Sequence, residues 1–310
     1  MLRKVTTLAL TAIGALTLGI PTAIAALDIG VSPSRVEVQI NRKTRTQSIR
    51  VLNLSSKPLE LKAYTRTWNM NENGKLEDIP STEESLDRWI VFTPSQFTIP
   101  PKSSQTIRFA IRPRVQLKPG EHRAVLYLEE VRPANEEQTK AIRTIGRFGV
   151  VIYGYVGDIK RVGVLNSITV DTKSKVPTAV FDVSSTGSGY VRLKGQYAVW
   201  SAAKYPGAKA TQGINDLGKP GKKLPENIID AGMLPISPVL PDTRRRLLLP
   251  IVKNLPPGNY VLDLNGELNG IKIDQGIPFT VTKQTNTQKP QSRNRPTTSP
   301  SNQNIPLRNR

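Results

Sequence analysis

The chain has 310 residues, and 44 lysines and arginines against 24 acidic residues give it a formal net charge of +20. This length allows about two domains of roughly 100–150 residues each, and the charge indicates an anionic partner. The absence of cysteine excludes disulfide bonds and every cysteine-based metal or nucleophilic site. The single histidine, His122, stands beside the turn at Pro119-Gly120, so we expect a turn or surface residue rather than a catalytic base.

Residues 1–25 have the pattern of a secretory signal peptide. Arg3 and Lys4 supply a positive start, an apolar run follows from residue 5 to residue 20, and Pro21 precedes a cleavage site that ends at Ala25. An uncleaved membrane anchor is the alternative, but the run is short for a bilayer span and contains several threonines and glycines. We therefore expect export, cleavage near Ala25 and a soluble periplasmic protein.

Short alternating segments dominate the next part of the chain. Val36, Val38 and Ile40 alternate with polar residues, which is typical of a strand with one buried face. Further strands are expected at residues 47–54, 59–68, 89–92 and 141–156, separated by a basic turn at 42–45, a loop or weak hairpin at 69–87 and a charged loop at 132–140. About seven short strands without a helical period predict a β-sandwich domain over residues 26–156.

The stretch from residue 97 to residue 131 has the clearest pattern. Ile107, Phe109 and Ile111 point one way in its first segment, while Ala124, Leu126 and Leu128 point one way in its second. Pro119-Gly120 supplies the turn between the segments. We expect two half-buried antiparallel strands, each with one face toward a core and one toward water.

A weaker copy of this strand–turn–strand unit occurs later in the chain. Residues 246–251 and 259–264 are apolar segments on either side of Pro257-Gly258, so Gly258 corresponds to Gly120. The repeat predicts a second domain of the same kind over residues 157–282. Around it we expect a hinge at 158–163, strands at 164–170, 178–183, 190–199 and 271–281, a tight turn at 186–189 and an exposed irregular loop at 202–225.

Residues 283–310 differ in kind from the two predicted domains. They are rich in Gln, Asn, Thr, Ser and Pro, with six basic residues and no acidic or aromatic residue. Such a segment buries too little apolar surface to offset the entropy of ordering, so we expect a disordered basic tail. Its role is either solubilising or the binding of an anionic polymer.

Several motifs of the first predicted domain resemble the PapD-like periplasmic chaperones, which assemble pili and fimbriae. An arginine, Arg35, stands in the first strand, and Asn53 ends a strand that is followed by Ser-Ser-Lys-Pro at 55–58. Residues 92–97 (FTPSQF) precede the run at 101–109 (PKSSQTIRF), and Pro119-Gly120 leads into the next strand. The resemblance covers residues 30 to about 155 and extends loosely to the second domain.

The resemblance implies an all-β chain of two tandem immunoglobulin-like β-sandwich domains with a cleft between them. In that family the last strand of the first domain is added to an incomplete pilin subunit, and a cleft Arg and Lys bind the C-terminal carboxylate of the subunit. Carried over, Arg35 matches the cleft Arg, and Arg147 is the nearest match to the Lys, with Arg143 as the other option. Ile142, Thr144 and Ile145 become the candidates for the donated strand.

The expected function is therefore that of a periplasmic chaperone whose partners are pilin-like or other exported subunits, with an outer-membrane usher as a further partner. The alternative is a structural envelope protein that binds acidic polysaccharide or a membrane surface, since either function uses positive charge. We expect no enzyme activity, cofactor, metal site or small-molecule substrate, because the sequence has no phosphate loop, nucleophile elbow or pair of histidines. Nucleic-acid binding is not expected either, because the sequence has no RNA-recognition signature and no basic helix.

Overall fold

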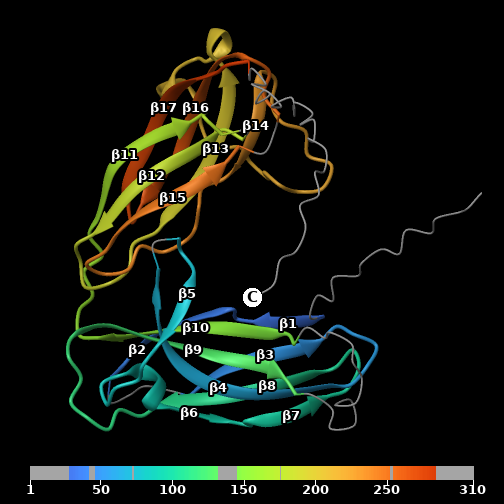
Figure 1. The fold of residues 1–310 in the computed structure, drawn as a ribbon, viewed down its shortest axis with the longest axis vertical. Coiled ribbons are helices and arrows are strands. Elements are labelled where there is room, and N and C mark those ends of the chain that lie inside the picture. Colours follow the sequence, from blue (N-terminus) through green and yellow to red (C-terminus); the bar gives the residue numbers. More distant parts are fainter. Residues whose placement is uncertain are drawn as a thin grey trace, which may run out of the picture.

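The computed structural model describes residues 28–41, 46–71, 73–131, 145–174, 176–251 and 254–283. The predicted signal peptide, the basic turn at 42–45, the charged loop at 132–140, the candidates Ile142 and Thr144, and the predicted tail beyond Lys283 lie outside these residues. The described chain folds into two immunoglobulin-like β-sandwiches, which lie one above the other in Figure 1. Within the described residues, no helix is long and apolar enough to cross a membrane.

The first sandwich consists of two sheets. One sheet has the order β1-β3-β8-β6, and the other has the order β2-β10-β9-β4-β5, with β7 paired to β4. The strands are β1 (Ile29–Ser32), β2 (Arg35–Gln39), β3 (Gln47–Asn53), β4 (Leu59–Met70), β5 (Leu76–Ile79), β6 (Ile90–Thr93), β7 (Gln96–Ile99), β8 (Ser104–Ile111), β9 (Gly120–Glu130) and β10 (Arg147–Val156), and the 3₁₀ helix η1 is Leu86–Arg88. β2 runs parallel to β10, whereas β9 is antiparallel to it.

The second sandwich packs a sheet of order β11-β12-β15 against a sheet of order β14-β13-β16-β17. Its strands are β11 (Gly163–Asp171), β12 (Thr178–Ser185), β13 (Leu193–Ser201), β14 (Ile228–Met233), β15 (Arg244–Pro250), β16 (Gly258–Leu268) and β17 (Ile271–Val281). The predicted loop at 202–225 is irregular apart from the short 3₁₀ helices η3 (Ala202–Lys204) and η4 (Ala208–Ala210). The β16–β17 turn is Asn269-Gly270, and both residues have positive φ, as in a type I′ hairpin.

The repeat predicted from Gly120 and Gly258 is present in the structure. Each glycine is the first residue of a strand, β9 in one sandwich and β16 in the other. The strand before the turn, β8 or β15, belongs to the opposite sheet, so the chain crosses the sandwich at this turn in both domains. The strand after it forms the longest hairpin of its domain, with β10 or β17. The expectation of two domains of one kind is therefore confirmed.

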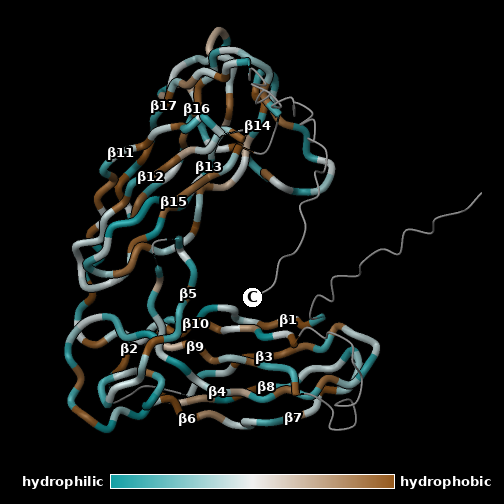
Figure 2. Tube along the Cα trace, in the orientation of Figure 1, coloured by the Kyte–Doolittle hydropathy of each residue, from teal (hydrophilic) through white to brown (hydrophobic). Residues whose placement is uncertain are grey.

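Each sandwich has its own apolar core, and Figure 2 shows hydrophobic residues along the strands of both sandwiches. Ile107, Phe109 and Ile111 of β8 are buried, as the period of two predicts. The second core is built in the same way around Phe181, Leu262 and Leu264, together with further aliphatic and aromatic residues. Alternation of apolar residues thus places one face of most strands in a core.

The prediction that one face of the strand with Ala124, Leu126 and Leu128 is exposed to water is wrong. All residues from Ala124 to Leu128 in β9 are buried. Ala124, Leu126 and Leu128 face the first core, whereas Val125 and Tyr127 belong to a separate cluster on the outer face of the sheet, which includes Tyr190 and Leu240 of the second sandwich. A neighbouring domain therefore replaces water on this face, and no pattern within one strand reports such a neighbour.

The polar segment at residues 69–87 was predicted to be a loop or a weak hairpin, and it contains a hairpin. β5 pairs with residues 67–70 of β4, and the pair projects from the first sandwich toward the second (Figure 1). Arg245, which is buried at the start of β15, donates hydrogen bonds from Nη1 to Met70 Sδ of the hairpin and to the carbonyl of Pro238. The hairpin therefore ties the two sandwiches together at a point away from the linker.

The linker between the domains, predicted as a hinge at 158–163, is held by the tight turn predicted at 186–189. The N–H of Thr186 donates to the carbonyl of Val162 at 2.9 Å, and the N–H of Gly189 donates to that of Lys160 at 3.2 Å. The N–H of Lys160 in turn donates to Ser188 Oγ at 3.0 Å. Three hydrogen bonds within a few residues fix the linker against the second domain.

We expect Gly187→Ala to lower the free energy of unfolding by about 1–3 kcal/mol, as overpacking does in tightly packed sites. A methyl group at Gly187 would lie 2.1 Å from the carbonyl oxygen of Lys160 and 2.7 Å from the nitrogen of Val162, and these are backbone atoms that cannot swing away. Urea unfolding measures the effect. Gly213→Ala is the matched control, because its methyl group would lie 3.6 Å from the nearest atom, Gln196 Oε1. Equal stability of both variants would contradict a tightly packed linker.

Candidate functional site

A cavity of about 340 Å³ lies where the two sandwiches meet. Its lining comes from β2 of the first domain, from the linker, and from the segment before β13, the start of β13 and the β16–β17 turn of the second domain. The lining residues are Arg35, Glu37, Arg161, Tyr190, Arg192, Lys194 and Asn269. Four of these side chains are cationic and one is a carboxylate, so the cavity is strongly positive.

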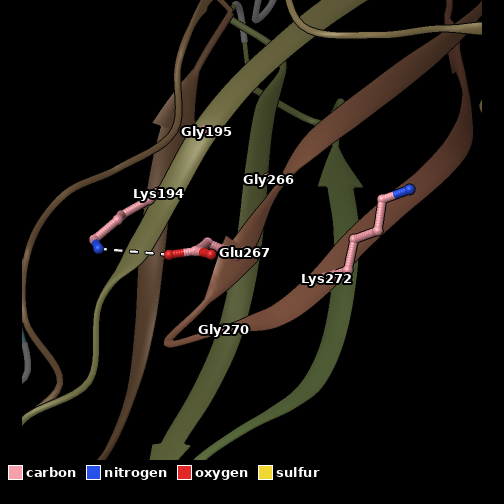
Figure 3. Close-up of a pocket in the computed structure, with 6 residues that line it drawn as sticks. All are labelled: Lys194, Gly195, Gly266, Glu267, Gly270 and Lys272. Atoms are coloured by element: carbon pink, nitrogen blue, oxygen red, sulfur yellow. Dashed lines mark ion pairs between the residues drawn. The ribbon is translucent and has the colours of Figure 1, made fainter.

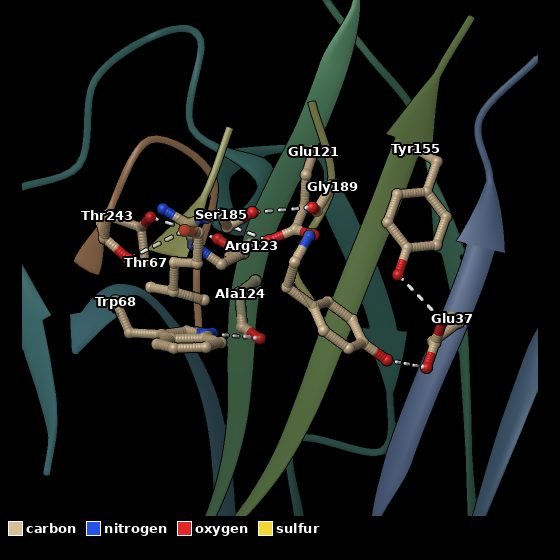
Figure 4. Close-up of polar contacts among 12 residues, drawn as sticks. Glu37, Thr67, Trp68, Glu121, Arg123, Ala124, Tyr155, Ser185, Gly189 and Thr243 are labelled. Carbon is tan, nitrogen blue, oxygen red and sulfur yellow. Dashed lines mark hydrogen bonds and ion pairs between the residues drawn. The ribbon is translucent and has the colours of Figure 1, made fainter. Parts of the chain in front are cut away.

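Glu37 is the carboxylate within this cationic cluster, and four groups contact it. It accepts hydrogen bonds from Tyr155 Oη at 2.8 Å and from Tyr190 Oη at 2.5 Å. Arg35 Nε lies 3.1 Å from Oε1, and Arg161 Nη2 lies 3.5 Å from Oε2. Figure 4 shows Tyr155 on β10 reaching Glu37 on the neighbouring β2. Glu37 therefore holds the side chains of Arg35 and Arg161 in place. Its ion pair with Arg35 involves Nε rather than the two terminal nitrogens of that guanidinium.

The two tyrosine hydroxyls act as proton donors to Glu37 throughout the neutral pH range. Burial, together with the hydrogen bond to Glu37, raises the pKa of Tyr190 to about 12. Burial and the same carboxylate also raise the pKa of Tyr155 far above its ordinary value. Neither hydroxyl ionises near neutral pH, so both remain hydrogen-bond donors to Glu37.

Tyr190 is the residue of the second domain around which the cavity is arranged. Its N–H donates to Glu121 Oε2 at 2.8 Å, and its ring packs against that of Tyr153 with centroids 4.6 Å apart. The guanidinium carbons of Arg161 and Arg192 lie 5.4 Å and 5.0 Å from the centre of the same ring. Cation–π contacts of this kind hold arginine side chains in place without neutralising them.

Glu121 anchors this arrangement from the first domain. Its side chain is fully buried, and Oε1 lies 3.0 Å from Nη1 of the largely buried Arg123. Burial raises the pKa of Glu121, although the N–H of Tyr190 and the charge of Arg123 both act to lower it. Figure 4 shows Glu121 beside Arg123 near the turn of the second domain that contains Gly189. The domains thus meet through the hydrogen bond from Tyr190 to this buried, ion-paired carboxylate and not only through apolar contacts.

Arg192 and Lys194 supply the charge that the cavity leaves available. Within the described residues no carboxylate lies within ion-pair distance of Arg192, and its buried Nε has no hydrogen-bond partner. The backbone N–H of Arg192 donates to Asn269 Oδ1 at 2.8 Å, which positions the chain at this point. Lys194 pairs with Glu267 at 3.4 Å, but both side chains are well exposed, so the pair is weak.

The two arginines predicted to act together lie apart in the structure. Arg35 pairs with Val151 across the β2–β10 ladder, and Arg147 precedes Val151 by four residues, which is about 13 Å along the strand. Arg147 does not line the cavity. Its guanidinium stacks over Tyr127 at 4.2 Å and lies 3.9 Å from a carboxylate oxygen of Asp78 in β5.

The remaining predicted site residue that the structure describes is Ile145, which stands just before β10 and is partly buried. β2 pairs with β10 only from Val151 to Tyr155. Within the described residues, no strand pairs with the outer edge of β10 from Arg147 to Val150. Among the described residues, this part of β10 therefore presents an open strand edge, on the strand that pairs with β2 farther along.

The sequence did not reveal the second-domain half of the site. Glu37 could have been found, because the period of two places it on the face of Arg35. The turn that carries Asn269 could also have been found, since Asn-Gly is a strong hairpin signal. Arg161, Tyr190 and Arg192 carry no such signal, because only the relative placement of the two domains brings them to β2.

The cavity has the chemistry of an anion-binding site. Guanidinium and ammonium groups from both domains converge, and the fixed hydroxyls hold Glu37 in place rather than offer a nucleophile. Within the described residues, no group of three or more acidic residues or histidines is placed to hold a metal ion.

Comparisons with known proteins point to one group of structures. No family model matches the sequence, and no curated protein matches it. The structure is similar to the class 5 fimbriae chaperone CfaA (16% identity, TM-score 0.39, 83% of this chain and 100% of that chain) and to the YadV chaperone (13%, 0.42, 82% and 100%). It is also similar to the CsuC–CsuE chaperone–tip adhesion subunit complex of Acinetobacter baumannii (13%, 0.39, 83% and 99%). These solved structures are chaperones of the kind that the sequence resemblance names.

Proposed function

We propose that this protein is a periplasmic chaperone that binds exported protein subunits. The subunit's C-terminal carboxylate binds in the cavity between the domains, and a strand of the subunit pairs with the open edge of β10. The observation that carries the proposal is the cavity itself, in which Arg35 of the first domain and Arg192 of the second line one space. A carboxylate is the simplest group of an exported polypeptide that such a pair would bind.

The assignment of roles follows from how each cation is engaged. Arg192 has no carboxylate partner among the described residues, so it provides the main charge for the ligand. Arg35 contacts Glu37 through Nε, which leaves its terminal nitrogens for the ligand. Arg192 thus takes the place that the resemblance gave to Arg147, whose guanidinium is engaged with Tyr127 and Asp78 instead.

Strand addition at β10 supplies the second part of the interaction. Backbone groups on an unpaired strand edge form hydrogen bonds with an incoming strand, and an incomplete subunit offers such a strand together with an apolar groove. The open edge is Arg147 to Val150 of β10. The following residues of β10, from Val151 on, pair with β2, the strand that carries Arg35. A bound carboxylate would therefore fix the register of the added strand.

We expect Arg35→Ala and Arg192→Ala each to reduce the recovery of envelope subunits about tenfold, because one charge-assisted contact is worth about 1.5–3 kcal/mol and part of it is screened by solvent. The measurement is co-purification of exported proteins from the native host with wild type and variants, at low and moderate salt. Arg108→Ala is the charge-matched control, because Arg108 is exposed on β8 in the sheet that does not border the cavity.

Equal recovery by all variants at moderate salt would contradict carboxylate binding in the cavity. The alternative function, binding of acidic polysaccharide or membrane surface, spreads the attraction over many of the 44 basic residues. It therefore predicts equal, small losses for Arg35→Ala, Arg192→Ala and Arg108→Ala, and a strong loss with added salt.

A further inference from the structure

We propose that the cavity selects a dianionic chain end, with the terminal carboxylate between Arg35 and Arg192 and an acidic side chain of one of the last residues at Lys194. The proposal rests on the proposed function and narrows its ligand. It starts from the charges: the lining has four cations and a single carboxylate, Glu37, while Glu267 pairs with Lys194 from outside the cavity. Subtracting the two carboxylates from the four cations leaves a net charge of about +2, whereas a chain terminus supplies only one negative charge.

The spacing between Arg192, just before β13, and Lys194, within it, fits this ligand. Leu193, fully buried, lies between Arg192 and Lys194, so both cationic side chains point to the opposite face of the strand. Two residues along a strand span about 7 Å. The cavity of about 340 Å³ is also large for a lone carboxylate, since a water molecule takes about 30 Å³ in the liquid. There is room for the last side chain of the ligand as well as its terminus.

Lys194 stands where the cavity continues into a second, shallower hollow of about 310 Å³ on the second domain. Gly195 and Gly266, which pair across β13 and β16, line this hollow (Figure 3). Lys194 and Lys272 lie on either side of Glu267 in the same view. Lys194 is the better placed of the two for a second acidic group, because Lys272 does not line the cavity and its ion pair with Asp274 (2.7 Å) is shorter than that of Lys194 with Glu267 (3.4 Å).

Three synthetic peptides test the proposal: N-acetyl-Ala-Ala-Asp and N-acetyl-Ala-Ala-Asn with free carboxylates, and N-acetyl-Ala-Ala-Asn amide. Binding to the full-length protein is followed by NMR titration at moderate salt. We expect the Asp peptide to bind about three- to fivefold more tightly than the Asn peptide, the size typical of a partly exposed ion pair. The Asn peptide should in turn bind about tenfold more tightly than its amide.

Lys194→Met should abolish the preference for Asp over Asn and leave the preference for carboxylate over amide intact. Lys204→Met is the control, because Lys204 is exposed beyond the far end of β13. Equal affinities of the Asp and Asn peptides for the wild type would overturn the dianionic ligand while leaving carboxylate capture standing. Equal affinities of the Asn peptide and its amide would instead overturn the proposed function. A preference for Asp that survives in Lys194→Met would overturn the assignment of Lys194.

Discussion

Replacing Glu121 by alanine is expected to lower the free energy of unfolding by about 3 kcal/mol, the lower end of the cost of breaking a buried ion pair, because Arg123 keeps some access to water. The variant leaves Arg123 without its carboxylate, and Arg123 Nε is already buried without a hydrogen-bond partner. It also leaves the N–H of Tyr190 without an acceptor. Chemical denaturation followed by fluorescence and circular dichroism measures the loss.

Glu121→Gln removes the negative charge but keeps a hydrogen-bond acceptor for the N–H of Tyr190, because the amide oxygen of Gln can accept that bond. It therefore separates the contribution of the charge from that of the hydrogen bond. Burial raises the pKa of Glu121 above its ordinary value of 4.5. A carboxyl whose pKa is raised by folding favours the folded state at low pH, and this contribution is lost as the pH rises through the folded pKa. The stability of the wild type relative to Glu121→Gln should therefore fall as the pH rises above 4.5. A relative stability that rises over this range would show that Arg123, rather than burial, dominates.

The fold was largely predictable because the relevant information is local. Alternation in residues such as Ile107, Phe109 and Ile111 reports which face of a strand enters a core, and the paired turns at Gly120 and Gly258 report the repeated unit. The strands β7 and β14 were not predicted as separate elements. The residues of β14 are all partly or fully exposed, so this strand gives no alternation to recognise.

The site was only partly predictable because its residues belong to different domains. Arg35 was identified through the family resemblance, and the structure places it in the cavity. Arg147 was assigned to the same cleft by its position in the last strand, but the ladder register separates it from Arg35 by four residues. Arg192 could not be paired with Arg35 from the sequence, since the angle between the domains is set by contacts such as those of Tyr190 with Glu37 and Glu121.

Tyr190→Ala is expected to lower the free energy of unfolding by about 3–5 kcal/mol, as large-to-small changes of buried aromatic residues do. Tyr190 is 6% exposed, and its ring contacts both Arg161 and Arg192 while packing against Tyr153. Since neither sandwich core contains Tyr190, both cores should persist, and the loss should appear as uncoupling of the two domains. Calorimetry should then show two thermal transitions where the wild type shows one.

Tyr190→Phe is the matched variant, because it removes only the hydroxyl that donates to Glu37. The loss of one hydrogen bond to a charged group should cost about 1.5–3 kcal/mol and leave a single transition. In the peptide titration, Tyr190→Ala should remove the preference for carboxylate over amide, because Arg192 and Arg35 no longer face one space. A Tyr190→Ala protein that unfolds in one transition and still distinguishes carboxylate from amide would mean that Tyr190 does not set the cavity. The hairpin contact between Met70 and Arg245 would then be the next determinant of the domain angle to test.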